Sequence, residues 1–75
     1  MPDCLTELAK ELQIQAFTVP IHDADAREQW RDHCAQLLAA LPPEERASQA
    51  MNFAMGLVVR GVSSDVALHY LEGGQ

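Results

Sequence analysis

The chain has few basic residues, and this scarcity argues against two common classes of function. Five lysines and arginines stand against eleven acidic residues, which gives a formal net charge of −6. Nucleic-acid binding requires clustered Lys and Arg side chains to neutralise phosphate, so direct binding of nucleic acid is not expected. Binding to anionic lipid lacks the same cations, and no apolar run approaches the ~20 residues that a membrane-spanning helix needs.

Cysteine is also scarce. Cys4 and Cys34 do not form part of a paired metal or redox motif. The opening residues, MPDC, lack the basic segment and the longer apolar segment of a secretory signal. We therefore expect a reduced, cytoplasmic protein in which both thiols pack as small hydrophobic groups.

Aromatic residues number four of 75, although 48% of the chain is hydrophobic. The apolar residues are mostly Leu, Val, Met and Ala, a composition that favours packed helices over strands. We expect one all-α domain over residues 1–75, compact and built from three to four helices. A core of this size supplies no more than ~3–5 kcal/mol by itself, so we expect a homodimer or a complex with another protein.

The first predicted helix covers residues 3–16, with Asp3 as its N-cap and leucines along one face. Residues 17–22 interrupt the pattern, because Pro20 and three β-branched residues disfavour helical geometry. This segment is predicted to be a connector whose apolar side chains fold back on the core.

The second predicted helix begins at a capping box formed by Asp25 and Glu28. It ends at Leu41, because two prolines follow. Its apolar residues recur at helical spacing and mark one buried face: Trp30, Cys34, Leu37, Leu38 and Leu41.

The third predicted helix starts at Pro43, with two acids beside the positive end of its dipole, and stops at Gly61. Phe53 and Met55 are predicted to lie off its buried side. That side is predicted to consist of Ala47, Ala50, Met51, Ala54, Leu57 and Val58.

The fourth predicted helix covers residues 64–72, with Ser63 as its N-cap and Gly73 as its stop. It is apolar on nearly every side, so it must be buried or must face a partner. Residues 60–65 form the junction with the third helix and have the pattern of a tight helix–turn–helix corner. DNA readers use such a corner, but residues 64–72 contain no Lys or Arg, and their two acids would repel phosphate.

Candidate nucleophiles and metal ligands do not form a convincing site. His33 and Cys34 are adjacent on a helix and therefore point about 100° apart. Cys34 with His33 or His69, and Cys4 with His22, have no third residue to orient them. We expect no catalysis, no cofactor and no metal.

The C-terminal part of the chain has more apolar side chains than a short domain readily buries. Met and aromatic residues are frequent in protein interfaces, so we predict partner binding through seven residues: Phe53, Met55, Leu57, Val66, Leu68, Tyr70 and Leu71. The alternative is that these residues form the core of the domain itself. Six acidic residues are predicted to orient the partner: Asp23, Asp25, Glu28, Asp32, Glu44 and Glu45.

Together these features favour a small, acidic, non-enzymatic regulator that acts by binding another protein. The most concrete version is an inhibitor that covers the basic surface of a nucleic-acid-handling protein, as small phage or mobile-element proteins such as anti-CRISPRs do. This analogy depends on size, charge and helical design. One alternative is a dimeric helix–turn–helix transcriptional regulator that contacts DNA through Arg27, Arg31, Arg46 and Arg60. Another is an assembly chaperone or a subunit of a larger complex.

Overall fold

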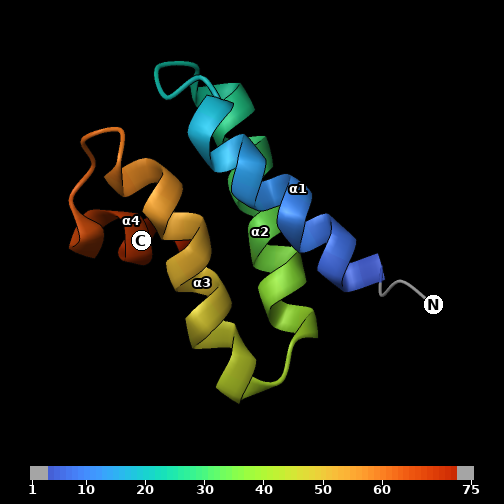
Figure 1. Ribbon diagram of the computed structural model, residues 1–75. Helices are drawn as coiled ribbons and strands as arrows, with labels where there is room; N and C mark the ends of the chain where they lie inside the picture. Colours follow the sequence, from blue (N-terminus) through green and yellow to red (C-terminus); the bar gives the residue numbers. More distant parts are fainter. Residues whose placement is uncertain (1–3, 73–75) are drawn as a thin grey trace.

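A computed structural model describes residues 4–72 as four α-helices without a strand. They are α1 (Cys4–Thr18), α2 (Ala24–Ala40), α3 (Pro43–Val58) and α4 (Ser64–Leu71). The all-α fold predicted from the sequence is confirmed (Figure 1). The predicted cap Asp3 and the predicted stop Gly73 lie outside the described residues.

The start of α2 differs from the prediction. The side chain of Asp23 accepts a hydrogen bond from the backbone N–H of Ala26 at 3.2 Å, so Asp23 is the N-cap and the helix begins at Ala24. Asp23 has the extended backbone that an N-cap requires, because the connector turns just before it, where the Asp23 N–H donates to the Pro20 carbonyl. Asp25 instead lies in the first turn as a favourable charge. The capping box predicted for Asp25 and Glu28 was therefore wrong.

The corner between α3 and α4 is built by local backbone chemistry. Gly61 has a φ of 103°, the left-handed conformation that a helix C-terminus commonly needs. Its N–H donates to the Val58 carbonyl at 3.0 Å, and the next N–H, from Val62, donates to Leu57 at 3.1 Å, which is the Schellman pattern. The Ser63 side chain then caps α4 by accepting from the Val66 N–H. The predicted stop and cap at this corner are confirmed.

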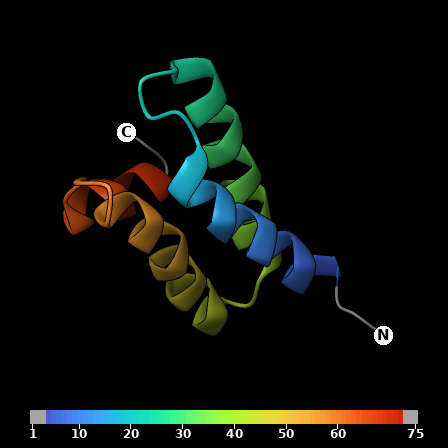
Figure 2. The same cartoon turned by 45° about the horizontal axis from the view of Figure 1, so that its top comes forward.

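Helix α3 packs against both α1 and α4. Figure 2 shows α1 alongside α2 and α3, while α4 folds back at the C-terminal end of α3. Gly56 permits the close approach of α1, since a Cβ at this position would overlap the Cβ of Ala16 and lie 2.9 Å from the Ala16 carbonyl carbon. Side chains from all four helices form one core, with Phe53, Leu12 and Cys34 fully enclosed.

This contact changes which face of α3 is buried. Phe53 is fully buried, whereas Ala47 and Met51 are exposed. The buried arc is rotated by roughly a quarter turn from the predicted one, given the 100° that separate successive helical residues. The prediction followed the most apolar arc of an isolated helix, but α1 covers the neighbouring arc that contains Gly56.

Arginine side chains donate hydrogen bonds to carbonyls in the last turns of three helices or at their C-caps. Arg60 donates to the Ala16 carbonyl of α1 at 3.1 Å, and Arg31 donates to the Tyr70 carbonyl of α4 at 3.0 Å. Arg46 donates to the carbonyls of Leu38 and Leu41 at the end of α2, at 2.8 and 2.9 Å. The last turns of α1 and α2 contain no basic residue of their own. The guanidinium groups therefore place positive charge where the helix dipole is negative.

A candidate protein-binding surface on α3

The seven residues predicted to bind a partner do not form one surface. Phe53, Leu57 and Leu71 are buried in the core, which corrects their assignment to an exposed binding face. Their side chains fill the space between α3 and its neighbours instead. Leu68 and Tyr70 are half-buried against the core. Met55 and Val66 are exposed and remain available to a partner.

The outer side of α3 presents a row of apolar side chains that we call the α3 ridge: Ala47, Met51, Met55 and Val59. Successive members are four residues apart, which places them on one helical face. Met51, Met55 and Val59 have exposed fractions of 45%, 48% and 62%. An uninterrupted apolar ridge of this kind is the part of a helix that packs into a groove on another protein.

Charge is absent from the whole stretch that carries the ridge. No acidic or basic residue occurs in 47–59 (ASQAMNFAMGLVV). Ser48 and Asn52, the polar side chains exposed next to the ridge, are uncharged. Depletion of charge at the centre of an apolar patch distinguishes interface cores from ordinary protein surface.

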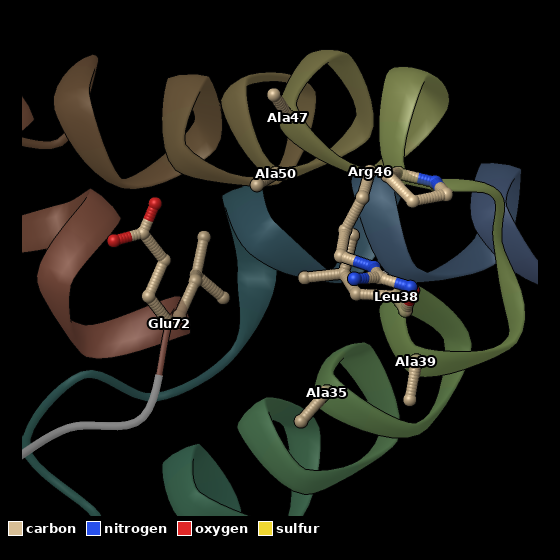
Figure 3. A pocket seen from close by; sticks show the side chains of 9 residues that line it. Ala35, Leu38, Ala39, Arg46, Ala47, Ala50 and Glu72 are labelled. Carbon is tan, nitrogen blue, oxygen red and sulfur yellow. Dashed lines mark hydrogen bonds between the residues drawn. The ribbon is translucent and has the colours of Figure 1, made fainter.

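A groove between α2 and α3 extends this surface. Figure 3 shows Ala35 and Ala39 of α2 on one side and Ala47 and Ala50 of α3 on the other. Leu38 also lines the groove, whose volume is about 500 Å³. Because alanines line both sides of the groove, a side chain or a helix can approach the backbone closely there. Ala47 belongs to both features, so the groove and the α3 ridge are continuous.

The two ends of the groove differ in charge. Glu72 lies at one end and Arg46 at the other (Figure 3). The Arg46 guanidinium donates to two backbone carbonyls, as described above, whereas Glu72 is exposed at the end of α4. The groove therefore offers an accessible carboxylate at one end.

The predicted electrostatic residues are all exposed. Asp25, Glu28 and Asp32 share one face of α2 with the groove alanines, since 25, 28, 32, 35 and 39 alternate spacings of three and four. Glu44 and Glu45 occupy the first turn of α3. Asp23 also caps α2. Acidic side chains are thus exposed on both helices that form the groove.

The cations that a DNA-binding function would use are engaged elsewhere. Each of the four arginines donates at least one hydrogen bond to a backbone carbonyl, with Arg27 bonded to Ile21 at 2.9 Å. The outer side of α4 presents Asp65 and Glu72, both acidic, together with His69. These carboxylates make the outer side of α4 unfavourable for phosphate.

The buried thiol of Cys34 does not have the environment of a catalytic nucleophile. Cys34 is fully buried, and desolvation raises the pKa of its thiol from 9.0 to about 12, so the reactive thiolate is not populated near neutral pH. Cys4 is exposed at the start of α1.

Within residues 4–72, no three His, Cys, Asp or Glu side chains converge as metal ligands would. In the same part of the chain, no helix has both the length and the apolarity to cross a bilayer.

Apolar periodicity did not identify three of the ridge residues, Ala47, Met51 and Val59, as surface residues. The signal that identifies them is the lack of charge over residues 47–59, combined with their spacing from Met55.

No known protein family, curated protein or solved structure matches this chain.

Proposed function

We propose that this protein is a small acidic regulator that binds another protein through the α3 ridge and the adjoining alanine groove. The observation that carries the proposal is the exposed, charge-free ridge of Met51, Met55 and Val59 on a chain of net charge −6. Burial of such side chains is a principal source of binding free energy at interfaces. The protein acts by occupying its partner's surface, without catalysis.

The chemistry of the partner follows from the charges on the two helices that form the groove. Asp25, Glu28 and Asp32 on α2 and two glutamates at the start of α3 would face a partner docked there. A basic surface complements these carboxylates and speeds association by electrostatic steering. Proteins that handle nucleic acids carry basic surfaces of this kind. We therefore propose that the partner is such a protein and that binding competes with its nucleic acid.

The alternative of direct DNA binding requires free cations on this chain. The engagement of all four guanidinium groups with backbone carbonyls disfavours it, because freeing three of them would expose carbonyls at helix C-termini and freeing Arg27 would expose the Ile21 carbonyl of the connector. Lys10 on α1 is an exposed cation on another helix, and one Lys does not provide the cluster that phosphate binding needs.

The test compares ridge variants with a matched control. The tagged wild-type chain is used to capture a partner from its native cell, and the recovered protein is then purified and its affinity measured by calorimetry. We expect Met51→Asp with Met55→Asp to weaken binding by about thirtyfold or more, equivalent to the ~2 kcal/mol of an interface hot spot. Ile14→Asp is the control, because Ile14 is 65% exposed on the outer side of α1 and should change affinity less than threefold.

The inhibitory part of the proposal is tested on the same purified partner. The wild-type chain should displace nucleic acid from the partner in a fluorescence polarisation assay, and the double ridge variant should not. Capture of equal strength by the ridge variant would contradict the docking surface. A partner that binds no nucleic acid would contradict the inhibitor proposal, as would a chain that associates only with copies of itself in sedimentation equilibrium.

A further inference from the structure

A second concave site lies at the corner of α3 and α4, away from the α3 ridge. This corner pocket has a volume of about 260 Å³. Apolar walls come from residues that include Ile21, Val62, Val66 and Ala67, and the polar side chains that line it are Arg27 and Tyr70. An apolar pocket with a few convergent polar groups is the usual form of a small-ligand site.

The two polar side chains have unsatisfied hydrogen-bonding atoms. Arg27 Nε and the Tyr70 hydroxyl are both buried and have no hydrogen-bond partner. Arg27 Nη1 donates to the Ile21 carbonyl at 2.9 Å, which anchors the guanidinium while leaving Nε unpaired. A buried polar group without a partner costs ~1–3 kcal/mol. A ligand that supplies an acceptor for these groups would recover that free energy.

Positive charge is concentrated beside this pocket. The guanidinium carbons of Arg27 and Arg31 lie 5.8 and 5.3 Å from the centroid of the Tyr70 ring. Both are within cation–π distance of the same ring. Two guanidinium groups therefore lie close to the same aromatic ring, which lines the apolar pocket.

We propose that the corner pocket binds a carboxylate carried on a small apolar group. The carboxylate accepts from the Arg27 guanidinium and the Tyr70 hydroxyl, since guanidinium and carboxylate form strong charge-assisted hydrogen bonds. The apolar group fills the space between Val62, Val66 and Ala67. Benzene fits an apolar cavity of ~150 Å³, so about 260 Å³ accommodates a ring together with a short acidic arm. The carboxylate belongs either to a free organic acid or to the C-terminal residue of a polypeptide.

Access to the two buried atoms requires a small movement. Arg27 and Tyr70 are each only half-buried as whole side chains. A rotation of the Tyr70 side chain about its Cα–Cβ bond would move the hydroxyl, while the fully buried Ala67 keeps α4 against the core. Binding should therefore perturb the Tyr70 ring and leave the helices unchanged.

The test uses 3-phenylpropanoate as the probe and 3-phenylpropan-1-ol as its neutral counterpart, titrated into the full chain and followed by NMR. We expect saturable binding of the acid with shifts of the Val62, Val66 and Ala67 methyl groups, and affinity for the alcohol at least tenfold weaker. Arg27→Met should weaken binding of the acid by about tenfold or more. Lys10→Met removes the same charge from α1 and should change affinity less than twofold.

Tyr70→Phe keeps the ring and removes only the hydroxyl, so it tests the site even if Arg27→Met unfolds the chain. We expect the affinity of Tyr70→Phe for 3-phenylpropanoate to fall about threefold or more. A peptide ending in Phe with a free carboxylate, compared with its C-terminal amide, distinguishes a polypeptide terminus from a free acid. Equal binding of acid and alcohol, methyl shifts outside the corner pocket, or no saturable binding would overturn the proposal. None of these outcomes depends on the α3 ridge.

Discussion

The contact between Gly56 and Ala16 allows a prediction in which two known effects have opposite signs. Replacing Gly56 with Ala in the interior of α3 improves helix propensity by about 1 kcal/mol. The new Cβ would overlap the Cβ of Ala16 and lie 2.9 Å from its carbonyl carbon. Neither neighbour is the mobile end of a long side chain, so relief requires α1 and α3 to separate.

The magnitude follows from the cost of overpacking. Extra atoms in a well-packed core cost ~1–3 kcal/mol, and the upper part of this range applies here because the backbone of α1 must move. Subtracting the propensity gain leaves an expected loss of about 2 kcal/mol for Gly56→Ala. For a domain of 60–100 residues this lowers the Tm by roughly 8–16 °C.

The assay is urea unfolding followed by the fluorescence of Trp30, the single tryptophan, which is buried and donates its indole N–H to the Leu12 carbonyl at 2.9 Å. Ser48→Ala is the control, because Ser48 is exposed on α3 and its replacement should change the free energy of unfolding by less than ~0.5 kcal/mol. The double variant Ala16→Gly with Gly56→Ala should recover part of the loss. A Gly56→Ala chain as stable as the wild type would refute the claim that this contact sets the spacing of α1 and α3.

Two further predictions concern groups that the tertiary structure ties to the backbone or to the core. Arg60→Met should lower the free energy of unfolding by about 1.5 kcal/mol, since it leaves the Ala16 carbonyl without its charged donor, whereas Lys10→Met should change it by less than ~0.5 kcal/mol in the same urea titrations. Burial raises the pKa of the Cys34 thiol from 9.0 to about 12. Between these pH values the unfolded chain loses a proton that the folded chain keeps, so the free energy of unfolding falls as the pH rises. Relative to Cys34→Ala, the free energy of unfolding of the wild type should fall by about 2 kcal/mol between neutral pH and about pH 10.5. If the free energies of unfolding of the two chains change with pH in parallel, Cys34 does not titrate in this way.

Much of the secondary structure could be predicted from the sequence because its signals act over a few residues. Pro42 and Pro43 end one helix and start the next, and Gly61 with Ser63 sets the corner between α3 and α4. These effects depend on local backbone geometry and on hydrogen bonds to near neighbours. The choice of Asp23 over Asp25 as a cap was harder, because it depended on where the connector turns.

The candidate surface could be predicted only in part. Met55 was identified from its residue type, and the acidic residues were expected to be exposed, but the burial of Phe53 and the exposure of Met51 could not be read from the periodicity of α3 alone. An apolar helix has several arcs that could face a core. Which of them is covered depends on the neighbouring helices.

Local sequence thus determined that this chain forms four helices with a tight C-terminal corner and a surface rich in carboxylates. The tertiary structure decided which side of α3 is left as the ridge, because Gly56 accepts α1 at Ala16, forty residues away along the chain. It likewise decided that three of the four arginines donate to carbonyls at helix C-termini, as when Arg60 reaches the Ala16 carbonyl. Contacts between residues so far apart depend on packing in three dimensions, which no pattern of near neighbours specifies.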